Sequence, residues 1–241
     1  MQWLSSEARF LKTQTKTTKM KTIILIFILI FGLDAWSQQL PIANQNLKQG
    51  WTRQFIKDVG FIDVPASMEL MSGTYKEFNN QILKQLEIEA PQVIFQQKGL
   101  NAYSSETFKH YVRVILETQV GKLGEFEKLN FNTSKITSAE INELNQFFKE
   151  KTTSDLNSIH QNIISWYPIK IEKVNGMSCL HISYQRRLND NPIVLVNTYI
   201  FQNYDRIHSL TLSYRMNETE IWKDDLDTIL KSFRITNIHL D

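Results

Sequence analysis

Four polar side chains on two predicted strands could form a site for chemistry or for binding. His181 and Ser183 alternate along one strand, and Ser209 and Thr211 alternate along another. Because every second residue of a strand lies on the same face of its sheet, we expect each pair to share a face. A histidine beside strand hydroxyls can act as a general base, and the same groups can hydrogen-bond a ligand or a partner segment. The sequence therefore predicts a shallow polar cleft centred on these four residues.

Apolar residues occupy the alternate positions of both strands. They are Leu180, Ile182 and Tyr184 in the first strand and Leu210, Leu212 and Tyr214 in the second. This pattern predicts a sheet with one apolar face and one hydroxyl-rich face. A simpler interpretation stays open, namely an antiparallel sheet with one side in contact with water.

The sequence contains no motif for a known chemistry. Its histidines lack the HExxH spacing of a zinc protease, and there is no G-x-S-x-G nucleophile elbow, P-loop or dinucleotide-binding glycine pattern. We therefore predict no catalytic residue, no metal site and no cofactor, and we favour a binding protein over an enzyme. The alternative is a hydrolase-like enzyme with His181 as its base.

Other reactive or charged groups have ordinary structural interpretations. Cys179, the only cysteine, lies among apolar residues, where a free thiol usually packs and stays unreactive. Asp224 and Asp225 are neighbours on a predicted helix, where successive side chains point about 100° apart, so we expect both in solvent. Arg186 and Arg187 are expected at a solvated strand end.

The elements that would position these groups follow from periodicity and turn residues. Strands are predicted at 52–57, 61–64, 93–96, 111–118, 169–174, 178–185, 193–201 and 207–214. The dipeptide Asn175-Gly176 predicts a hairpin because both turn positions favour positive φ. Helical spacing occurs at 75–86, after a capping box at 137–140, and after a second cap at 217–220.

The two later helices each carry an apolar stripe that should pack against the sheet. The stripes are Ile141, Leu144, Phe147 and Phe148 in the middle helix, and Ile221, Trp222, Leu226, Ile229, Leu230 and Phe233 in the closing helix. Strands grouped in the middle with helices before and after them favour an α+β fold with an antiparallel sheet.

Three segments in this order resemble the PsbP-like superfamily, in particular its exported DcrB-like branch. They are GFIDVP, VNTYIFQNYDRIHSLTLSYR and ETEIWKDDLDTILKSFRI. The resemblance covers about 52–235 and implies an α/β/α sandwich, an antiparallel sheet flanked by helices. Members of the superfamily mostly bind proteins or support assemblies, and the resemblance transfers no catalytic residue.

The strongest local signal lies near the start of the chain. Lys21 precedes an apolar run at 23–33, and Ala35-Trp36-Ser37 follows it. A basic start, an apolar core of about 7–15 residues and a small-residue cleavage site are the parts of a signal peptide, whereas a spanning helix needs about 20 apolar residues. We therefore predict export, cleavage near Ser37 and no stable membrane anchor afterwards. Met20 is an alternative start to Met1.

Removal of residues 1–37 would also change the net charge. The chain has 27 basic and 25 acidic residues, and the removed part holds five and two of them, which leaves 22 basic against 23 acidic. Nucleic-acid binding rests on basic side chains that neutralise phosphates. We therefore predict no nucleic-acid partner.

The predicted organisation has three parts. Residues 1–37 form an extension and signal peptide, 38–50 a flexible segment, and 51–241 a single PsbP-like α+β domain. The predicted function is that of an exported, non-catalytic binding or assembly-support protein of the cell envelope, in the periplasm or secreted. Its expected partner is an envelope protein or a small ligand.

Overall fold

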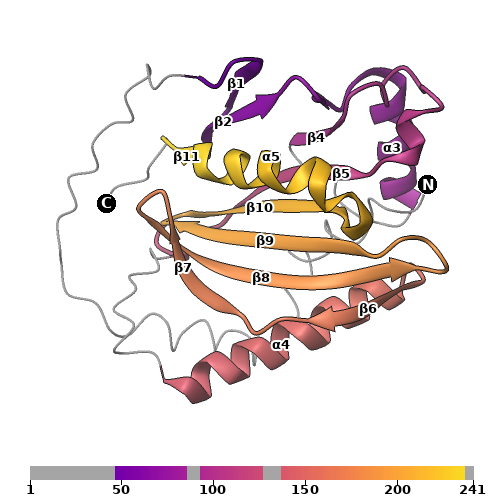
Figure 1. Ribbon diagram of the computed structural model, residues 1–241. Helices are drawn as coiled ribbons and strands as arrows, with labels where there is room; N and C mark the ends of the chain where they lie inside the picture. Colours follow the sequence, from indigo (N-terminus) through magenta and orange to yellow (C-terminus); the bar gives the residue numbers. More distant parts are fainter. Residues whose placement is uncertain (1–46, 86–92, 127–136, 237–241) are drawn as a thin grey trace.

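The computed structural model describes residues 47–85, 93–126 and 137–236, which form two antiparallel sheets and three α-helices (Figure 1). The small sheet has the order β1 (Trp51–Ile56), β2 (Gly60–Pro65) and β11 (Arg234–Ile235). The large sheet has the order β3-β4-β5-β10-β9-β8-β6, and β7 also pairs with β8. The predicted signal peptide lies outside the described residues.

The strands of the large sheet are β3 (Met68–Leu70), β4 (Val93–Gln97), β5 (Val112–Val120), β6 (Gln161–Trp166), β7 (Lys170–Val174), β8 (Met177–Leu188), β9 (Val194–Asn203) and β10 (Arg206–Arg215). The helices are α3 (Gly73–Gln85), α4 (Ser138–Asn157) and α5 (Thr219–Ser232), with short 3-10 turns η2 (Thr107–Lys109) and η3 (Met216–Glu218).

The first hairpin forms where the sequence predicts it. Trp51 pairs with Pro65 and Ile56 pairs with Gly60, and β2 ends at Pro65 because proline has no N–H for the ladder. The end of the described chain returns as β11 beside β2. Gly60 permits this approach, since a Cβ there would lie 2.0 Å from the carbonyl oxygen of Arg234.

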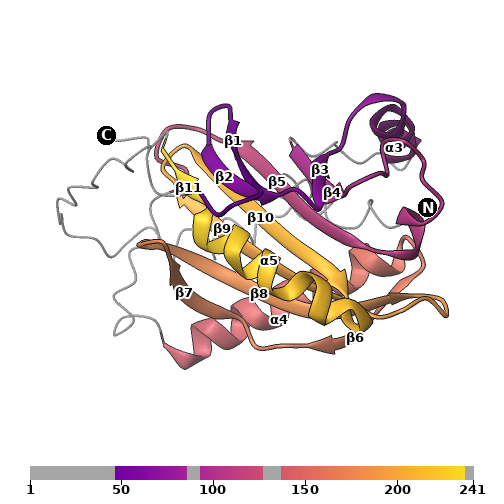
Figure 2. The same ribbon diagram turned by 45° about the horizontal axis from the view of Figure 1, so that its top comes forward.

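Helices cover both faces of the large sheet (Figure 2). On one face, α5 packs over β5, β9 and β10, in a core that also includes residues of the small sheet. On the opposite face, α4 packs over β6 and β8, and α3 packs over β4 and β5. The predicted α+β fold, an antiparallel sheet flanked by helices, is therefore confirmed.

The middle helix begins as predicted but packs differently. The Thr137 hydroxyl accepts from the Glu140 N–H at 3.2 Å, and the Glu140 carboxylate accepts from the Thr137 N–H at 2.7 Å, which completes the capping box. The fully buried residues are Thr152 and Leu156 in the last turns, whereas the predicted stripe is only half-buried. The chain then forms β6, which the sequence analysis missed. A register shift between Ile163 and Ser165 interrupts its alternation.

The closing helix buries most of its predicted stripe. Trp222, Leu226, Ile229 and Phe233 are buried, but Ile221 is 50% exposed, so its predicted place in the stripe is wrong. The predicted cap is also wrong in detail, because residues before the helix form η3 and no side chain caps the first turn.

Glu218 fixes the start of α5 in place of a cap. It is buried, and its Oε2 accepts hydrogen bonds from the Tyr111 N–H at 3.1 Å and from the Trp222 indole N–H at 2.7 Å. Its Oε1 lies 3.4 Å from Nη1 of Arg215. One inward-facing carboxylate therefore joins the end of β10, the entry to β5 and the first turn of α5.

Arg186 is another correction to the sequence analysis. Its side chain is fully buried rather than solvated, and it donates to Oε1 of Gln161 and, at 3.0 Å, to the hydroxyl of Tyr111. The reason is that β8 continues to Leu188 and pairs with β6. The two arginines thus lie inside a strand, where alternation directs Arg186 inward and Arg187 outward.

Candidate functional site

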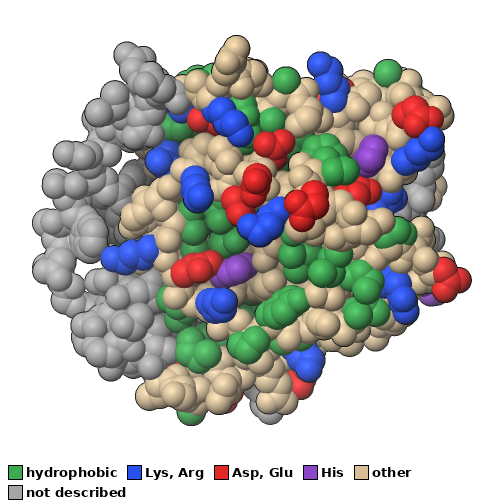
Figure 3. Space-filling view, viewed as in Figure 1, with side chains coloured by type: hydrophobic (Ala, Val, Ile, Leu, Met, Phe, Trp, Pro, Cys, Tyr) green, Lys and Arg blue, Asp and Glu red, His purple; other side chains and the backbone are tan. Residues whose placement is uncertain are grey.

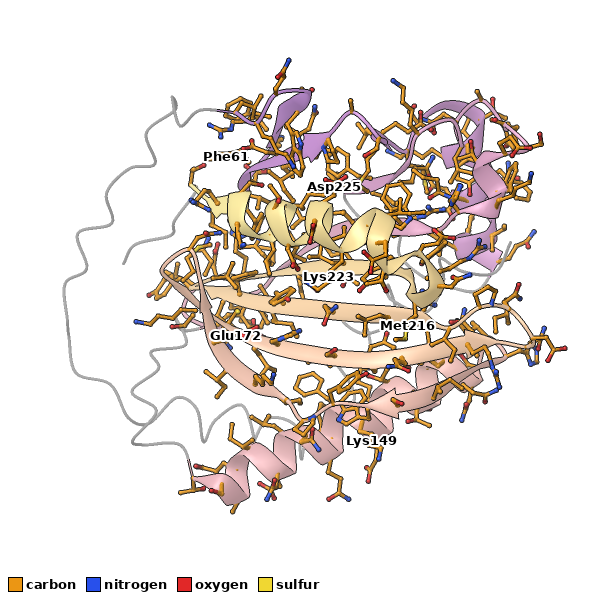
Figure 4. All side chains as sticks on the ribbon, viewed as in Figure 1. Phe61, Lys149, Glu172, Met216, Lys223 and Asp225 are labelled. Atoms are coloured by element: carbon orange, nitrogen blue, oxygen red, sulfur yellow. The ribbon has the colours of Figure 1, made fainter. Side chains whose placement is uncertain are left out.

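The face of the large sheet that carries α5 is left partly uncovered over β7, β8 and the start of β9. Figure 3 shows charged side chains along α5, and hydrophobic side chains on the sheet below it around a histidine and an acidic side chain. In Figure 4, Glu172 on β7 lies across this region from Lys223 of α5 and Met216 of η3. We call this surface the open sheet face; it comprises Glu172, His181, Ser183, Gln185 and Asn197.

His181 lies on β8 in the open sheet face and is held on three sides. Its Nδ1 lies 2.7 Å from Oε1 of Glu172 on β7, and its Nε2 lies 3.0 Å from Oδ1 of Asn197 on β9. Its ring also stacks on Tyr199, with the ring centroids 4.3 Å apart and an angle of 14° between the planes. With 14% of the side chain exposed, the imidazole is a fixed group at the surface.

The hairpin between β7 and β8 places Glu172 beside His181. Asn175 and Gly176 both have positive φ, at 53° and 80°, as the predicted turn requires. In the register that this turn sets, Glu172 pairs with Cys179. Cys179 lies two residues before His181 on β8, so Glu172 and His181 are on the same face of the sheet. Glu172 was not predicted as a site residue, although the two-residue turn fixes this register. Asn197 and Tyr199 were not predicted either, because their positions depend on the pairing of β8 with β9.

Both nitrogens of the His181 ring are occupied. If both carry protons, the ring is an imidazolium that donates to Glu172 and to Oδ1 of Asn197. If the Asn197 amide is turned, a neutral ring donates to Glu172 and accepts from the amide N–H. In either arrangement the hydrogen bonds hold the ring and the Glu172 carboxylate in one orientation.

The cluster around His181 lacks an activated nucleophile. Ser183 lies two residues along the same face, but the hydrogen bonds of the ring go to Glu172 and Asn197, and an activated serine needs the base within about 2.6–3.2 Å. Burial, and then the charge of Glu172, raises the pKa of the Cys179 thiol to about 12. Burial, followed by the charges of nearby groups, also raises the pKa of Tyr199. Both groups therefore keep their protons at neutral pH, and the predicted packing role of Cys179 is consistent with its burial.

Ser209 and Thr211 do not share a face with His181, so the predicted cleft of four residues is wrong. His181 pairs with Tyr199, and Tyr199 pairs with Leu210, which places the two hydroxyl residues on the other side of the sheet. There they are 3% and 2% exposed, and Thr211 Oγ1 lies 3.0 Å from Thr198 Oγ1. Helices cover both faces, so the apolar residues of different strands need not lie on the same side.

Metal ligands and membrane spans are two further features on which function could rest. In the described ranges, no three or more His, Cys, Asp or Glu side chains form a group that could hold a metal ion. Among the same residues, no helix is both long and apolar enough to cross a membrane.

Comparison with known proteins gives matches in structure only. No family model matches the chain, and no curated protein matches it. Among solved structures, the cyanobacterial PsbP of Synechocystis has 14% identity over 81% of this chain and 98% of its own, with a TM-score of 0.45. LpqN of Mycobacterium tuberculosis, described as involved in cell envelope biogenesis, has 14% identity over 77% of this chain and 90% of its own, with a TM-score of 0.41.

These matches concern the fold. Both alignments have 14% identity and TM-scores below 0.5, so the PsbP-like resemblance stays a prediction. Identities this low transfer neither activity nor site residues. The DcrB-like branch stays a prediction.

Proposed function

We propose that this protein is an exported binding or assembly-support protein that docks a partner on the open sheet face. The observation that carries the proposal is the three-sided clamp on His181, formed by Glu172, Asn197 and Tyr199. Groups that are already fixed lose little conformational freedom when a partner binds. The clamp thus supplies a preorganised hydrogen-bonding surface, whereas catalysis by the same histidine would need a free ring nitrogen.

The partner group that best fits this surface is a cationic side chain. Glu172 is 39% exposed, and its Oε1 is oriented by His181. Lys223 of α5, which lies across this region from Glu172 (Figure 4), pairs with Asp227 on the same helix. A lysine or arginine of an extended partner segment would form charge-assisted hydrogen bonds with these carboxylates. It would compete with Lys223 for Asp227. Lys223 and Asp227 form a half-exposed ion pair with an N–O distance of 2.6 Å, and such a pair contributes little to stability in water.

Export is the second part of the proposal. It rests on the apolar run at 23–33 and on Ala35-Trp36-Ser37, the parts of a cleavable signal peptide. Cleavage near Ser37 would leave the described residues on the outer side of the inner membrane, in the periplasm or secreted, where an envelope protein could reach the open sheet face.

A hydrolase-like enzyme is the second candidate, and one observation favours it. The pair of Glu172 and His181 has the geometry of a carboxylate that orients a histidine base. Asn197 takes the position at Nε2 that a nucleophilic hydroxyl would need. For this reason we place binding first.

The docking proposal can be tested with a tetra-arginine peptide and isotope-labelled protein. Addition of the peptide should shift the NMR signals of the Asn197 side-chain amide and the Ser183 backbone amide. Glu172→Gln removes the charge and keeps the shape, and should weaken binding about tenfold, the value of one charge-assisted hydrogen bond. Glu77→Gln, at an exposed position of α3, is the matched control and should bind like the wild type. Equal binding by all three proteins would refute the cationic-partner proposal.

A second experiment addresses the partner in the cell and the enzyme alternative. A photo-crosslinking p-benzoylphenylalanine at Ser183 should give an adduct with an envelope protein that is lost when His181→Ala is added, and the same group at Glu77 should give none. The wild type and His181→Ala are then screened with ester and peptide substrates. Turnover by the wild type that His181→Ala abolishes, with an unchanged melting temperature, would show that the protein is an enzyme.

A further inference from the structure

Arg113 on β5 is a buried cation on the face of the large sheet opposite α5. Its side chain is 3% exposed, and it lies between Gln96 of β4 and Ser213 of β10, its partners in the strand register. Helix α3 covers this part of the sheet, since Tyr75 packs with Ile94 of β4. The region is separate from the open sheet face.

The hydrogen bonds of Arg113 go to neutral groups. Its Nη1 donates to Oε1 of Gln97 at 2.7 Å and to the Val112 carbonyl at 2.8 Å, and its Nη2 donates to the Tyr75 hydroxyl at 3.4 Å. Within the described ranges no carboxylate lies within ion-pair distance of its guanidinium. Glu69, two strands away in the same row of the sheet, accepts instead from the Asn101 N–H. Because arginine stays protonated in proteins, its buried charge lacks a counter-ion among the described residues, which is an unfavourable arrangement.

Among the described residues, α3, β4 and β5 each carry a buried polar atom that has no hydrogen-bond partner. They are Nε of Arg113, Oε1 of Gln96 and Nδ2 of Asn79. Gln96 is fully buried and directs its own N–H group to Asn101 at 3.1 Å. Asn79 is 3% exposed and lies one helical turn after Tyr75 on the sheet-facing side of α3. Three elements therefore direct two donors and one acceptor toward the layer between α3 and the sheet.

We propose that this layer is a binding site for a small oxyanion, a carboxylate or a phosphate. The anion would supply the missing counter-charge, accept a charge-assisted hydrogen bond from Arg113 Nε and accept a second hydrogen bond from Asn79 Nδ2. A hydroxyl on the ligand, as in a hydroxy acid or a protonated phosphate, would donate to Gln96 Oε1. The ligand enters by displacement of α3 from the sheet.

The test is the thermal stability of the purified protein in acetate, lactate and phosphate against chloride, at matched pH and ionic strength. Ligand that binds only the folded state raises the melting temperature with concentration. At a hundred times the dissociation constant, we expect an increase of about 5–10 °C for a chain of this size. Lactate above acetate would indicate a hydroxy acid, and phosphate above both would indicate a phosphate ligand.

Three variants separate specific binding from the general stabilisation that excluded salts produce. Arg113→Met removes the charge and should abolish the oxyanion-dependent increase, while Arg187→Met, at an exposed position of β8, should keep it. Gln96→Glu places a carboxylate opposite Arg113 and should also abolish the increase, which keeps the test available if Arg113→Met does not fold. In the wild type, titration should shift the NMR signal of Arg113 Nε–H. An equal increase of the melting temperature in the wild type and Gln96→Glu, with no shift of that NMR signal, would refute the proposal. It would show that only water hydrogen-bonds to these three atoms.

Discussion

Glu218→Ala should be one of the most destabilising single changes that a charged residue of this protein can undergo. The carboxylate is 6% exposed and accepts from two buried donors, the Tyr111 N–H and the Trp222 indole N–H. Alanine would leave both donors without a partner. A buried donor left unpaired costs about 1–3 kcal/mol, so the two together give about 4 kcal/mol, a large part of a domain's stability of about 5–15 kcal/mol.

Urea unfolding followed by far-UV circular dichroism measures this change. With an m-value of about 2 kcal/mol/M, the midpoint should fall by about 2 M for Glu218→Ala. Glu218→Gln keeps the shape and one accepting oxygen but loses the charge beside Arg215, and should lose about half as much. The control is Glu220→Ala, an exposed position of the same helix, which should change stability by no more than about 0.5 kcal/mol. If Glu218→Ala falls within the range of this control, Glu218 does not hold the start of α5.

Two further predictions concern packing around the sheet. Trp222→Ala should lower the free energy of unfolding by about 3–5 kcal/mol, as truncation of a buried aromatic does. Ile221→Ala, at a residue that is 50% exposed, should lower it by well under half of that in the same urea assay. Equal losses of stability would mean that α5 packs through a different face. The pKa of the Cys179 thiol is raised to about 12 by burial and then by the charge of Glu172. This thiol should therefore resist iodoacetamide at pH 8 in the native protein and react once the protein is unfolded in urea. Rapid labelling of the folded protein, followed by mass spectrometry, would contradict the inert role of this cysteine.

The sequence was sufficient for features that depend on residues close to one another in the chain. The turn at Asn175-Gly176 and the capping box at Thr137 both form as predicted, because each is decided by backbone preferences and hydrogen bonds within a few residues. The stripe through Trp222 and Phe233 also held, since helical spacing alone puts these residues on one side. Together with the antiparallel strands, such local features suffice to predict an α+β fold.

Tertiary structure decided which residues meet across strands that are distant in the chain. Alternation places His181 on one face of β8 and Ser209 on one face of β10. Only the pairing of both strands with β9 shows that these are opposite faces of the sheet. Arg186 and Arg113 are buried because helices cover the second face of the sheet as well, which no local pattern of charge reveals. The sequence by itself thus determined the local turns, caps and helical stripes. Tertiary structure alone decided that Glu172, rather than a strand hydroxyl, contacts His181. The physical reason is that side-chain contacts follow from strand register and layer packing, and the sequence of a single strand specifies neither.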